Sequence, residues 1–145
     1  MYMINGLKIT KMFISIICPS YNSSAFISKT VESILSQTYQ KFEVIFSDDG
    51  SSDETVNILE KFKLLFQQKN ISVKIIKNNH KGPGFARNEA LKVASHDWIA
   101  FIDSDDLWTK DKLKEAVQEI KKNGSLNCVL HRQIYLKKNK KKKYF

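Results

Sequence analysis

The chain has 145 residues, of which 42% are hydrophobic, and it carries a formal net charge of +9. This length and composition suit one globular domain and argue against intrinsic disorder. Six lysines between residues 137 and 143 supply most of the charge, and the rest of the chain carries only +3. Net charge therefore gives no argument for nucleic-acid binding, and no specific nucleic-acid partner is expected.

The two cysteines, Cys18 and Cys128, are far apart and show no CxxC spacing. Neither a disulfide framework nor a zinc site is expected, and a reducing compartment fits this usage. No stretch approaches the roughly 18 consecutive apolar residues of a transmembrane helix, and no signal-peptide core is found. The sequence thus predicts a cytoplasmic protein.

Short apolar runs alternate with segments of helical period along the chain. Buried strands are predicted at residues 13–18, 42–47, 73–77 and 98–102. Helices are predicted within residues 23–38, 54–66 and 85–94, and from Thr109 to Gly124. Ser23 or Ser24 is available as the N-cap of the first helix, and residues 127–136 are a candidate for one more strand.

This alternation predicts an α/β fold, with a mainly parallel sheet, helices on both faces and right-handed crossovers. Residues 1–11 lack a clear period and are expected to form a loose leader. The folded domain is expected to span residues 12–136, and a lysine-rich tail follows at residues 137–145.

A polar loop follows each predicted strand. The four loops are PSYN (19–22), SDDGSS (47–52), HKGPGFARN (80–88) and DSDD (103–106). Any one of them is equally typical of a plain turn, because Asp, Gly, Ser and Pro dominate turns. In open α/β sheets, however, ligands bind outside the carboxyl ends of the strands. The four loops together therefore predict a ligand site at one edge of the sheet.

The stretch DSDD places three carboxylates directly after an apolar strand. Asp103 and Asp105 flank Ser104, so in an extended segment they point the same way. These carboxylate oxygens would be ligands of Mg²⁺ or Mn²⁺. The cation would relieve their repulsion and bridge to substrate phosphates. The alternative is that Asp106 and its neighbours only favour the start of the next helix, which explains one carboxylate better than three.

Other polar and aromatic residues of these loops leave two interpretations open. Asp49 can accept a hydrogen bond from a base or a sugar, or it can be a solvated turn residue. Tyr21 can stack on a base or pack within its own loop. The histidines show no ligand spacing, and surface or loop positions are expected for His80, His96 and His131.

The loop Gly82-x-Gly84-x-x-Arg87 is similar to a dinucleotide-binding fingerprint, with Asp103 as its acidic residue. Arg87, however, stands where the third glycine permits close packing of helix on strand, and this argues against a nicotinamide or flavin cofactor. An arginine at a helix start suits a phosphate instead, since the guanidinium group and the helix N-terminus each attract anions.

Taken in order, these motifs resemble the family 2 inverting glycosyltransferases of GT-A fold. The resemblance runs from about Phe13 to Ile120, and its segments are ISIICPSYNSSAFISKTVESILSQTYQKFEVIFSDDGSSDET, GPGFARNEAL and WIAFIDSDDLW. Any single motif is weak, but their order and spacing together are specific. The resemblance implies a Rossmann-like GT-A half-domain that binds a nucleotide-diphospho-sugar, with a UDP-sugar as the expected donor.

The resemblance also implies roles for individual residues. The residues implied to bind the donor are Pro19, Tyr21, Asp49, Arg87, Asp103 and Ser104. Pro19 and Tyr21 match the segment around the base and ribose, and Asp49 matches the acid that reads a uracil-type base edge. Arg87 matches a basic residue near the donor. Asp103 and Asp105 match the DxD element that holds ribose and a divalent metal, Mg²⁺ or Mn²⁺, with Asp105 as the more direct metal ligand.

The implied activity is transfer of the sugar to a saccharide or lipid-linked acceptor in bacterial surface polysaccharide synthesis. Family members usually continue past the DxD with an acceptor-binding half that supplies the catalytic base, and no acidic residue follows Glu119 here. The resemblance therefore implies the N-terminal, donor-binding half, in which donor binding is retained and transfer is weak or absent.

Two alternatives stay open, a non-catalytic nucleotide-sugar-binding remnant and a basic-tailed adaptor for membrane or nucleic acid. Lysines near an anionic surface each add roughly 1 kcal/mol, so peripheral contact of the tail with the inner face of the membrane is also expected. A half-domain exposes a sheet edge and apolar surface, which predicts self-association.

Overall fold

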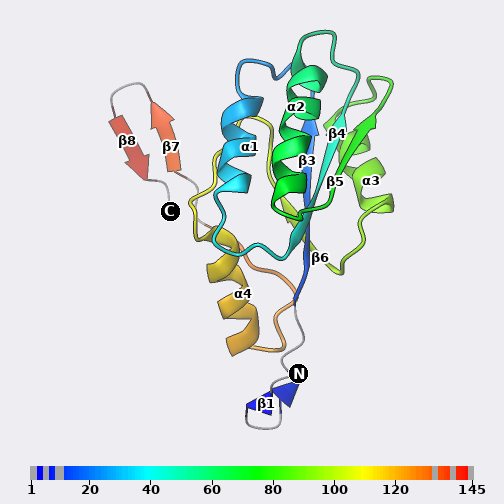
Figure 1. Ribbon diagram of the computed structural model, residues 1–145. Coiled ribbons are helices and arrows are strands. Elements are labelled where there is room, and N and C mark those ends of the chain that lie inside the picture. The colour runs from blue at the N-terminus through cyan, green and yellow to red at the C-terminus, as the bar shows by residue number, and fades with distance from the viewer. Residues whose placement is uncertain (1–2, 5–6, 9–11, 132–133, 138–139, 144–145) are drawn as a thin grey trace. The chain divides into compact units, whose positions relative to one another are not determined.

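The computed structural model describes the backbone of residues 3–4, 7–8, 12–131, 134–137 and 140–143, and the side chains of residues 12–131 (Figure 1). The chain divides into two compact units, Met1–Lys114 and Glu115–Phe145. The first unit contains the main sheet with three helices. The second contains most of helix α4 (Lys112–Lys122) and the strands β7 (Ile134–Lys137) and β8 (Lys140–Lys143), which pair antiparallel with each other.

Four parallel strands form the sheet of the first unit. They are β3 (Ile14–Ser20), β4 (Phe42–Asp48), β5 (Val73–Lys77) and β6 (Trp98–Phe101). Their order is β5-β4-β3-β6, and every pair of neighbours is parallel. The parallel sheet predicted from the alternating pattern is therefore confirmed, and each predicted strand lies within two residues of the observed one.

Helices cover both faces of this sheet, as predicted. They are α1 (Ile27–Leu35), α2 (Thr55–Gln68) and α3 (Pro83–Lys92). Figure 1 shows α1 and α2 in front of the sheet and α3 behind it. Helix α2 contacts α1 and β5, whereas α3 contacts β3 and β4. None of the helices in the part of the chain described here is long and apolar enough to cross a bilayer.

The two central strands are buried along their whole length because each carries apolar side chains on both faces. Ile17 and Ile45 pair in register and pack with Ala90 of α3. Phe46, the next residue of β4, meets Phe66 of α2 with ring centroids 6.2 Å apart. This double burial explains why both strands appear in the sequence as continuous apolar runs.

The start of α1 differs from the prediction. The helix begins at Ile27, and its N-cap residue Phe26 has no side-chain cap. The prediction that the hydroxyl of Ser23 or Ser24 caps this helix is therefore wrong. The carbonyl of Ser23 does accept the amides of Phe26 and Ile27, both at 2.9 Å, and its hydroxyl is left for other partners.

Short strands also occur near the two ends of the chain. Strands β1 (Met3–Ile4) and β2 (Leu7–Lys8) pair antiparallel inside the expected leader. The extra strand expected in residues 127–136 corresponds in part to β7, which belongs to a separate two-stranded sheet. The other residues of leader and tail lie outside the described residues, and the expected domain limits at 12 and 136 stay a prediction.

A buried carboxylate, Glu43, holds the amino ends of the strands together. It is 3% exposed. It accepts hydrogen bonds from the Ser15 hydroxyl at 2.7 Å and from the Ser95 amide at 2.6 Å, and Lys74 Nζ lies 3.0 Å from Oε2. Burial acts to raise the pKa of Glu43, but the partners Ser15, Ser95 and Lys74 outweigh it and lower the pKa to about 2.

We expect Glu43→Gln to lower the free energy of unfolding at neutral pH by about 1–3 kcal/mol, because the buried partners lose a charged acceptor. A depressed folded pKa adds stability above the ordinary value of 4.5, and this stability is lost as the pH falls from there through about 2. The difference between variant and wild type in urea unfolding should therefore shrink between about pH 5 and pH 3.

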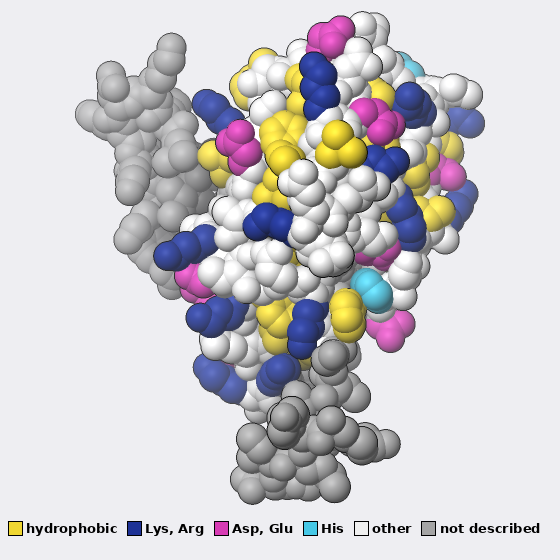
Figure 2. Space-filling model, viewed as in Figure 1, with side chains coloured by type: hydrophobic (Ala, Val, Ile, Leu, Met, Phe, Trp, Pro, Cys, Tyr) yellow, Lys and Arg dark blue, Asp and Glu magenta, His cyan; other side chains and the backbone are white. Residues whose placement is uncertain are grey.

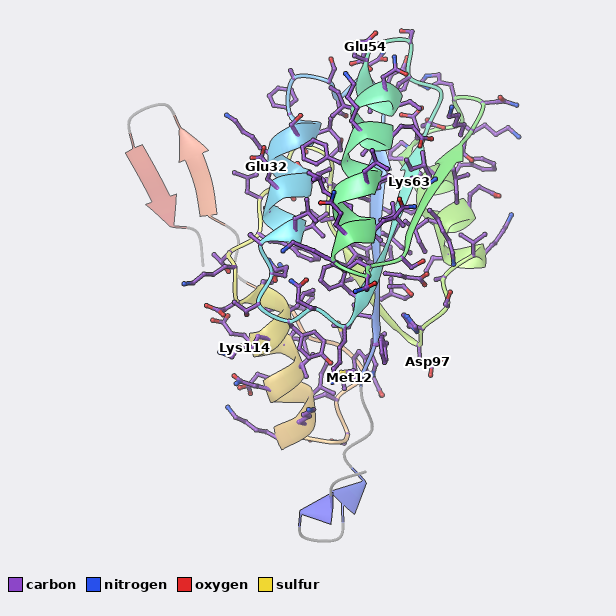
Figure 3. The ribbon with its side chains drawn as sticks, viewed as in Figure 1. Met12, Glu32, Glu54, Lys63, Asp97 and Lys114 are labelled. Carbon is purple, nitrogen blue, oxygen red and sulfur yellow. The ribbon has the colours of Figure 1, made fainter. Side chains whose placement is uncertain are left out.

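The control is Glu32→Gln, which changes an exposed carboxylate on α1 (Figure 3) and should leave unfolding near wild type at every pH. A difference between Glu43→Gln and wild type that stays constant across this pH range would contradict the assignment.

Candidate functional site

The loops that follow the strands start from one edge of the sheet. Ser20, Asp48 and Lys77 end three neighbouring strands and lie in register. The pairing then continues past the strands, since the amide of Asp49 donates to Ser20 O at 2.7 Å and that of Asn78 to Asp48 O at 2.8 Å. The backbone therefore fixes where the loops after β3, β4 and β5 begin.

At this edge the loops enclose a cavity of about 390 Å³. All the residues predicted to bind donor or metal line it, namely Pro19, Tyr21, Asp49, Arg87, Asp103, Ser104 and Asp105. The structure thus brings together residues from all four polar loops, and their roles in binding stay a prediction at this point.

Asp49 is a buried residue that accepts hydrogen bonds from another loop, and it is not a solvated turn residue. It is 2% exposed. Its Oδ1 accepts the amide of Lys81 at 2.8 Å, and its Oδ2 accepts the amide of Gly82 at 2.7 Å. Gly50, next in the chain, has φ +81°, and a Cβ there would lie 3.1 Å from the His80 amide nitrogen. The loop after β4 and the loop after β5 therefore pack against each other in the cavity wall.

Tyr21 stacks on His80 within this wall. The ring centroids are 4.2 Å apart with an interplanar angle of 28°. Tyr21 is 46% exposed, so the pair is accessible from solvent. His80 also lies 3.2 Å from the carbonyl oxygen of Asp49 through Nδ1. The aromatic pair offers a flat surface of the kind on which a base stacks.

Arg87 projects from α3 to Asp103 and forms an ion pair with it. Helix α3 begins at Pro83 after Gly82, and Arg87 lies one turn further on the face toward the cavity. The pair is partly exposed, with side-chain exposures of 33% and 52%. Arg87 therefore offsets one of the three neighbouring charges and keeps a positive group beside the cavity.

The remaining carboxylates of DSDD repel one another. Partial burial, reinforced by the charges of Asp103 and Asp105, raises the pKa of Asp106. Burial, with the charge of Asp103 added, raises the pKa of the Cys18 thiol on β3. Cys18 is thus an inert core residue.

The chemistry of this set suits a hard divalent cation only in part. Among residues 12–131, no group of three or more His, Cys, Asp or Glu side chains is placed to hold a metal ion. Mg²⁺, however, is commonly bound by one or two carboxylates together with substrate phosphates. Asp103 and Asp105 fit that pattern, in which the phosphates complete the coordination.

Five further lining residues lie in the loops predicted to form the site but were not predicted individually to bind donor or metal. They are Ser20, His80, Gly82, Pro83 and Ala86. His80 is a loop histidine, as expected, and its stacking on Tyr21 depends on tertiary packing that sequence spacing does not reveal. The dinucleotide fingerprint lacks its third glycine, because Arg87 stands at that position and pairs with Asp103, the acidic residue of the pattern.

A cavity at the carboxyl ends of a parallel sheet is where open α/β proteins bind their ligands, and this fold and site define the chain as a ligand-binding α/β protein. The sequence model of glycosyl transferase family 2 matches residues 15–144, and the chain belongs to this family.

Known proteins agree with this membership. Over 112 residues the chain is 43% identical to WfgD of Escherichia coli, a UDP-Glc:alpha-D-GlcNAc-diphosphoundecaprenol beta-1,3-glucosyltransferase, covering 77% of this chain and 42% of WfgD. The crystal structure of S. aureus TarS 1–349 in complex with UDP aligns with TM-score 0.70 and 35% identity, over 78% of this chain and 33% of that one.

The mannosyltransferase PcManGT from Pyrobaculum calidifontis, in complex with GDP-Man and Mn²⁺, aligns with TM-score 0.69 and 25% identity, over 77% of this chain and 33% of that one. These structures share the GT-A fold, so the fold expected from the resemblance is confirmed. The chain spans less than half the length of each of these proteins.

We expect Asp49→Asn to loosen the loop after β5. The asparagine side chain has one oxygen, so its NH₂ group would face one of the two backbone N–H groups that the carboxylate accepts. Hydrogen exchange at the amides of Lys81 and Gly82 should accelerate, and the free energy of unfolding should fall by about 1–3 kcal/mol.

Asp97→Asn, in the exposed turn before β6 (Figure 3), is the matched control and should change neither measurement. Unchanged exchange at Lys81 and Gly82 in Asp49→Asn would show that the carboxylate does not hold this loop.

Proposed function

We propose that this chain binds a nucleotide-diphospho-sugar, with UDP as its nucleotide, as the donor site of a family 2 glycosyltransferase. One observation carries the proposal: residues from all four strand-end loops line a single acid-rich cavity in a chain of this family. Two relatives support UDP as the nucleotide, since WfgD is named for UDP-Glc and TarS has been solved with UDP.

The base and ribose lie against Pro19 and Tyr21 in this proposal, and Asp49 reads the base edge. Both Asp49 oxygens already accept one backbone amide each. A carboxylate oxygen has two lone pairs. His80 Nδ1 lies 3.4 Å from Oδ2 as well, so Oδ1 is the oxygen with room for a further hydrogen bond. The N3–H of uracil is a suitable donor, and the bonds from Lys81 and Gly82 hold the carboxylate in place to receive it.

Asp103, Ser104 and Asp105 face the ribose and diphosphate, and Asp103 and Asp105 would hold Mg²⁺ or Mn²⁺. The Mn²⁺ in the PcManGT complex supports a metal of this kind. When bound, such a cation offsets the negative charge of the diphosphate leaving group. Arg87 orients Asp103 through their ion pair and adds positive charge beside the phosphates.

Sugar transfer belongs to the whole glycosyltransferase in this proposal. Its acceptor is a saccharide or a lipid-linked saccharide of a bacterial surface polysaccharide. The name of WfgD supports this, because it gives a GlcNAc-diphosphoundecaprenol. None of the residues assigned here is placed as the catalytic base. Donor binding without transfer is the alternative, and turnover of a bound donor separates the two.

Two predictions about partners stay outside the site. Peripheral contact with the inner face of the membrane concerns the lysines of residues 137–143, whose side chains are not described. Self-association concerns the edge strand β6, where Phe101 is 50% exposed. On the face drawn in Figure 2, basic, acidic and apolar side chains are interspersed, so this face shows no large patch of one charge sign.

Titration calorimetry with UDP, GDP and ADP, each with and without Mn²⁺, tests the proposal. We expect UDP to bind most tightly and only weakly without the metal. Asp105→Asn should weaken UDP binding in Mn²⁺ about tenfold or more, since even an outer-shell change costs a metal site that much.

Asp97→Asn is again the matched control, because it removes an exposed charge away from the cavity lining and should leave the affinity unchanged. Failure of all three nucleotides to bind the folded chain would overturn the proposal, and preference for GDP would overturn the choice of nucleotide. Transfer of sugar from a UDP-sugar to an acceptor by this chain would exclude the alternative, which is donor binding without transfer.

A further inference from the structure

Helix α1 holds the loop that contains Asp103 and Asp105, although it lies outside the cavity lining. Thr30, in the middle of α1, is fully buried. Its hydroxyl donates to the carbonyl oxygen of Ser104 at 2.8 Å. Ser104 is the residue between the two proposed metal ligands, so this bond fixes the peptide that joins them.

A second hydroxyl holds the same residue from the loop after β3. Ser23 is 6% exposed, and its Oγ lies 2.7 Å from Ser104 Oγ. Ser23 Oγ also donates to the carbonyl oxygen of Tyr21 at 3.1 Å. A hydroxyl has a single proton, so Ser104 is the donor to Ser23. The loop of the proposed base site is thereby joined to the loop of the proposed metal site.

Helix α1 and the residues just after it also hold the chain beyond Asp105. Ser33 Oγ accepts the amide of Trp108 at 3.2 Å. Gln37, 1% exposed, donates to Thr109 O at 2.8 Å and accepts the amide of Leu113 at 3.1 Å. Thr30 and Ser33 lie one turn apart on α1, and Gln37 lies just past the end of the helix at Leu35. We call these three residues the α1 polar stripe.

Every loop partner of this stripe is a backbone group, between Ser104 and Leu113. That segment contains no strand and reaches helix only at Lys112, so few of its peptide groups pair within regular structure. Apolar residues on α1 would bury equally well but would leave these groups unpaired. The stripe therefore gives a loop without regular structure a single backbone conformation.

We propose that Thr30 and Ser23 are positioning residues, which hold Ser104 so that Asp103 and Asp105 keep the spacing and direction that metal and diphosphate require. This inference rests on the proposed donor site. Arg87 holds Asp103 from α3, and Thr30 holds the next residue from α1. The loop is thus fixed from helices on both faces of the sheet.

Thr30→Val removes the hydroxyl and keeps the branched shape, whereas Thr30→Ser keeps the hydroxyl. We expect Thr30→Val to accelerate hydrogen exchange across residues 103–108. It should weaken UDP binding in Mn²⁺ roughly three- to tenfold, the range expected for one lost hydrogen bond. UDP binding without Mn²⁺ should change less. The ratio of the UDP affinity with Mn²⁺ to the affinity without it, which we call the affinity ratio, therefore falls. Thr30→Ser should restore both measurements.

Ser15→Ala is the matched control. It deletes a buried hydroxyl of β3 that donates to Glu43, at the other end of the sheet from the cavity. It should lower the free energy of unfolding without changing the affinity ratio or the exchange at residues 103–108. That ratio is the measurement that general destabilisation leaves unchanged.

Wild-type exchange and a wild-type affinity ratio in Thr30→Val would overturn the inference, and so would the same changes in Ser15→Ala. If the wild type binds no UDP, the proposed function fails, and exchange at residues 103–108 still decides whether Thr30 holds the loop. If Thr30→Val does not fold, Ser23→Ala is measured in its place with the same expected results.

Discussion

The parallel pairing of β3 with β4 is the constraint on which the rest of the site depends. It runs in register from Ile14 with Phe42 to Ser20 with Asp48, and it brings two loops to the same edge. Asp49 can reach the Lys81 and Gly82 amides only because β5 is paired to β4 in the same direction. The cavity is thus a consequence of strand direction, and its chemistry comes from what each loop carries there.

Charge at the cavity follows a second constraint, since three carboxylates lie within four residues. Arg87 forms an ion pair with Asp103. The charge of Lys112 acts to lower the pKa of Asp106, but partial burial and the charges of Asp103 and Asp105 outweigh it and raise that pKa. The protein does not remove this repulsion by spacing the acids apart. It fixes the loop firmly enough to keep them together, and a bound cation would gain from that arrangement.

The sequence was sufficient for the parts of this structure that follow from local pattern. Apolar runs and helical periods gave the strands and helices, and strand ends gave the loops of the cavity. It was insufficient where a side chain has a choice of partners. Ser23 stands where an N-cap is expected, yet its hydroxyl is bonded to Tyr21 and Ser104, which lie on different loops. Asp49 looks like a turn residue, and only the packed β5 loop reveals that it is buried. Such choices depend on tertiary neighbours, which one sequence does not display.

The unused cap and the α1 polar stripe have one physical explanation. A serine cap typically stabilises a helix by about 1 kcal/mol, and polar residues inside a helix give up apolar burial. Both local losses at α1 are offset by bonds to the segment from Ser104 to Leu113. Places where a chain departs from local preference with a compensating contact are where function is expected. Two of these contacts, from Ser23 and Thr30, reach Ser104 between Asp103 and Asp105. They make the stability of α1 and the geometry of the proposed metal site parts of one network.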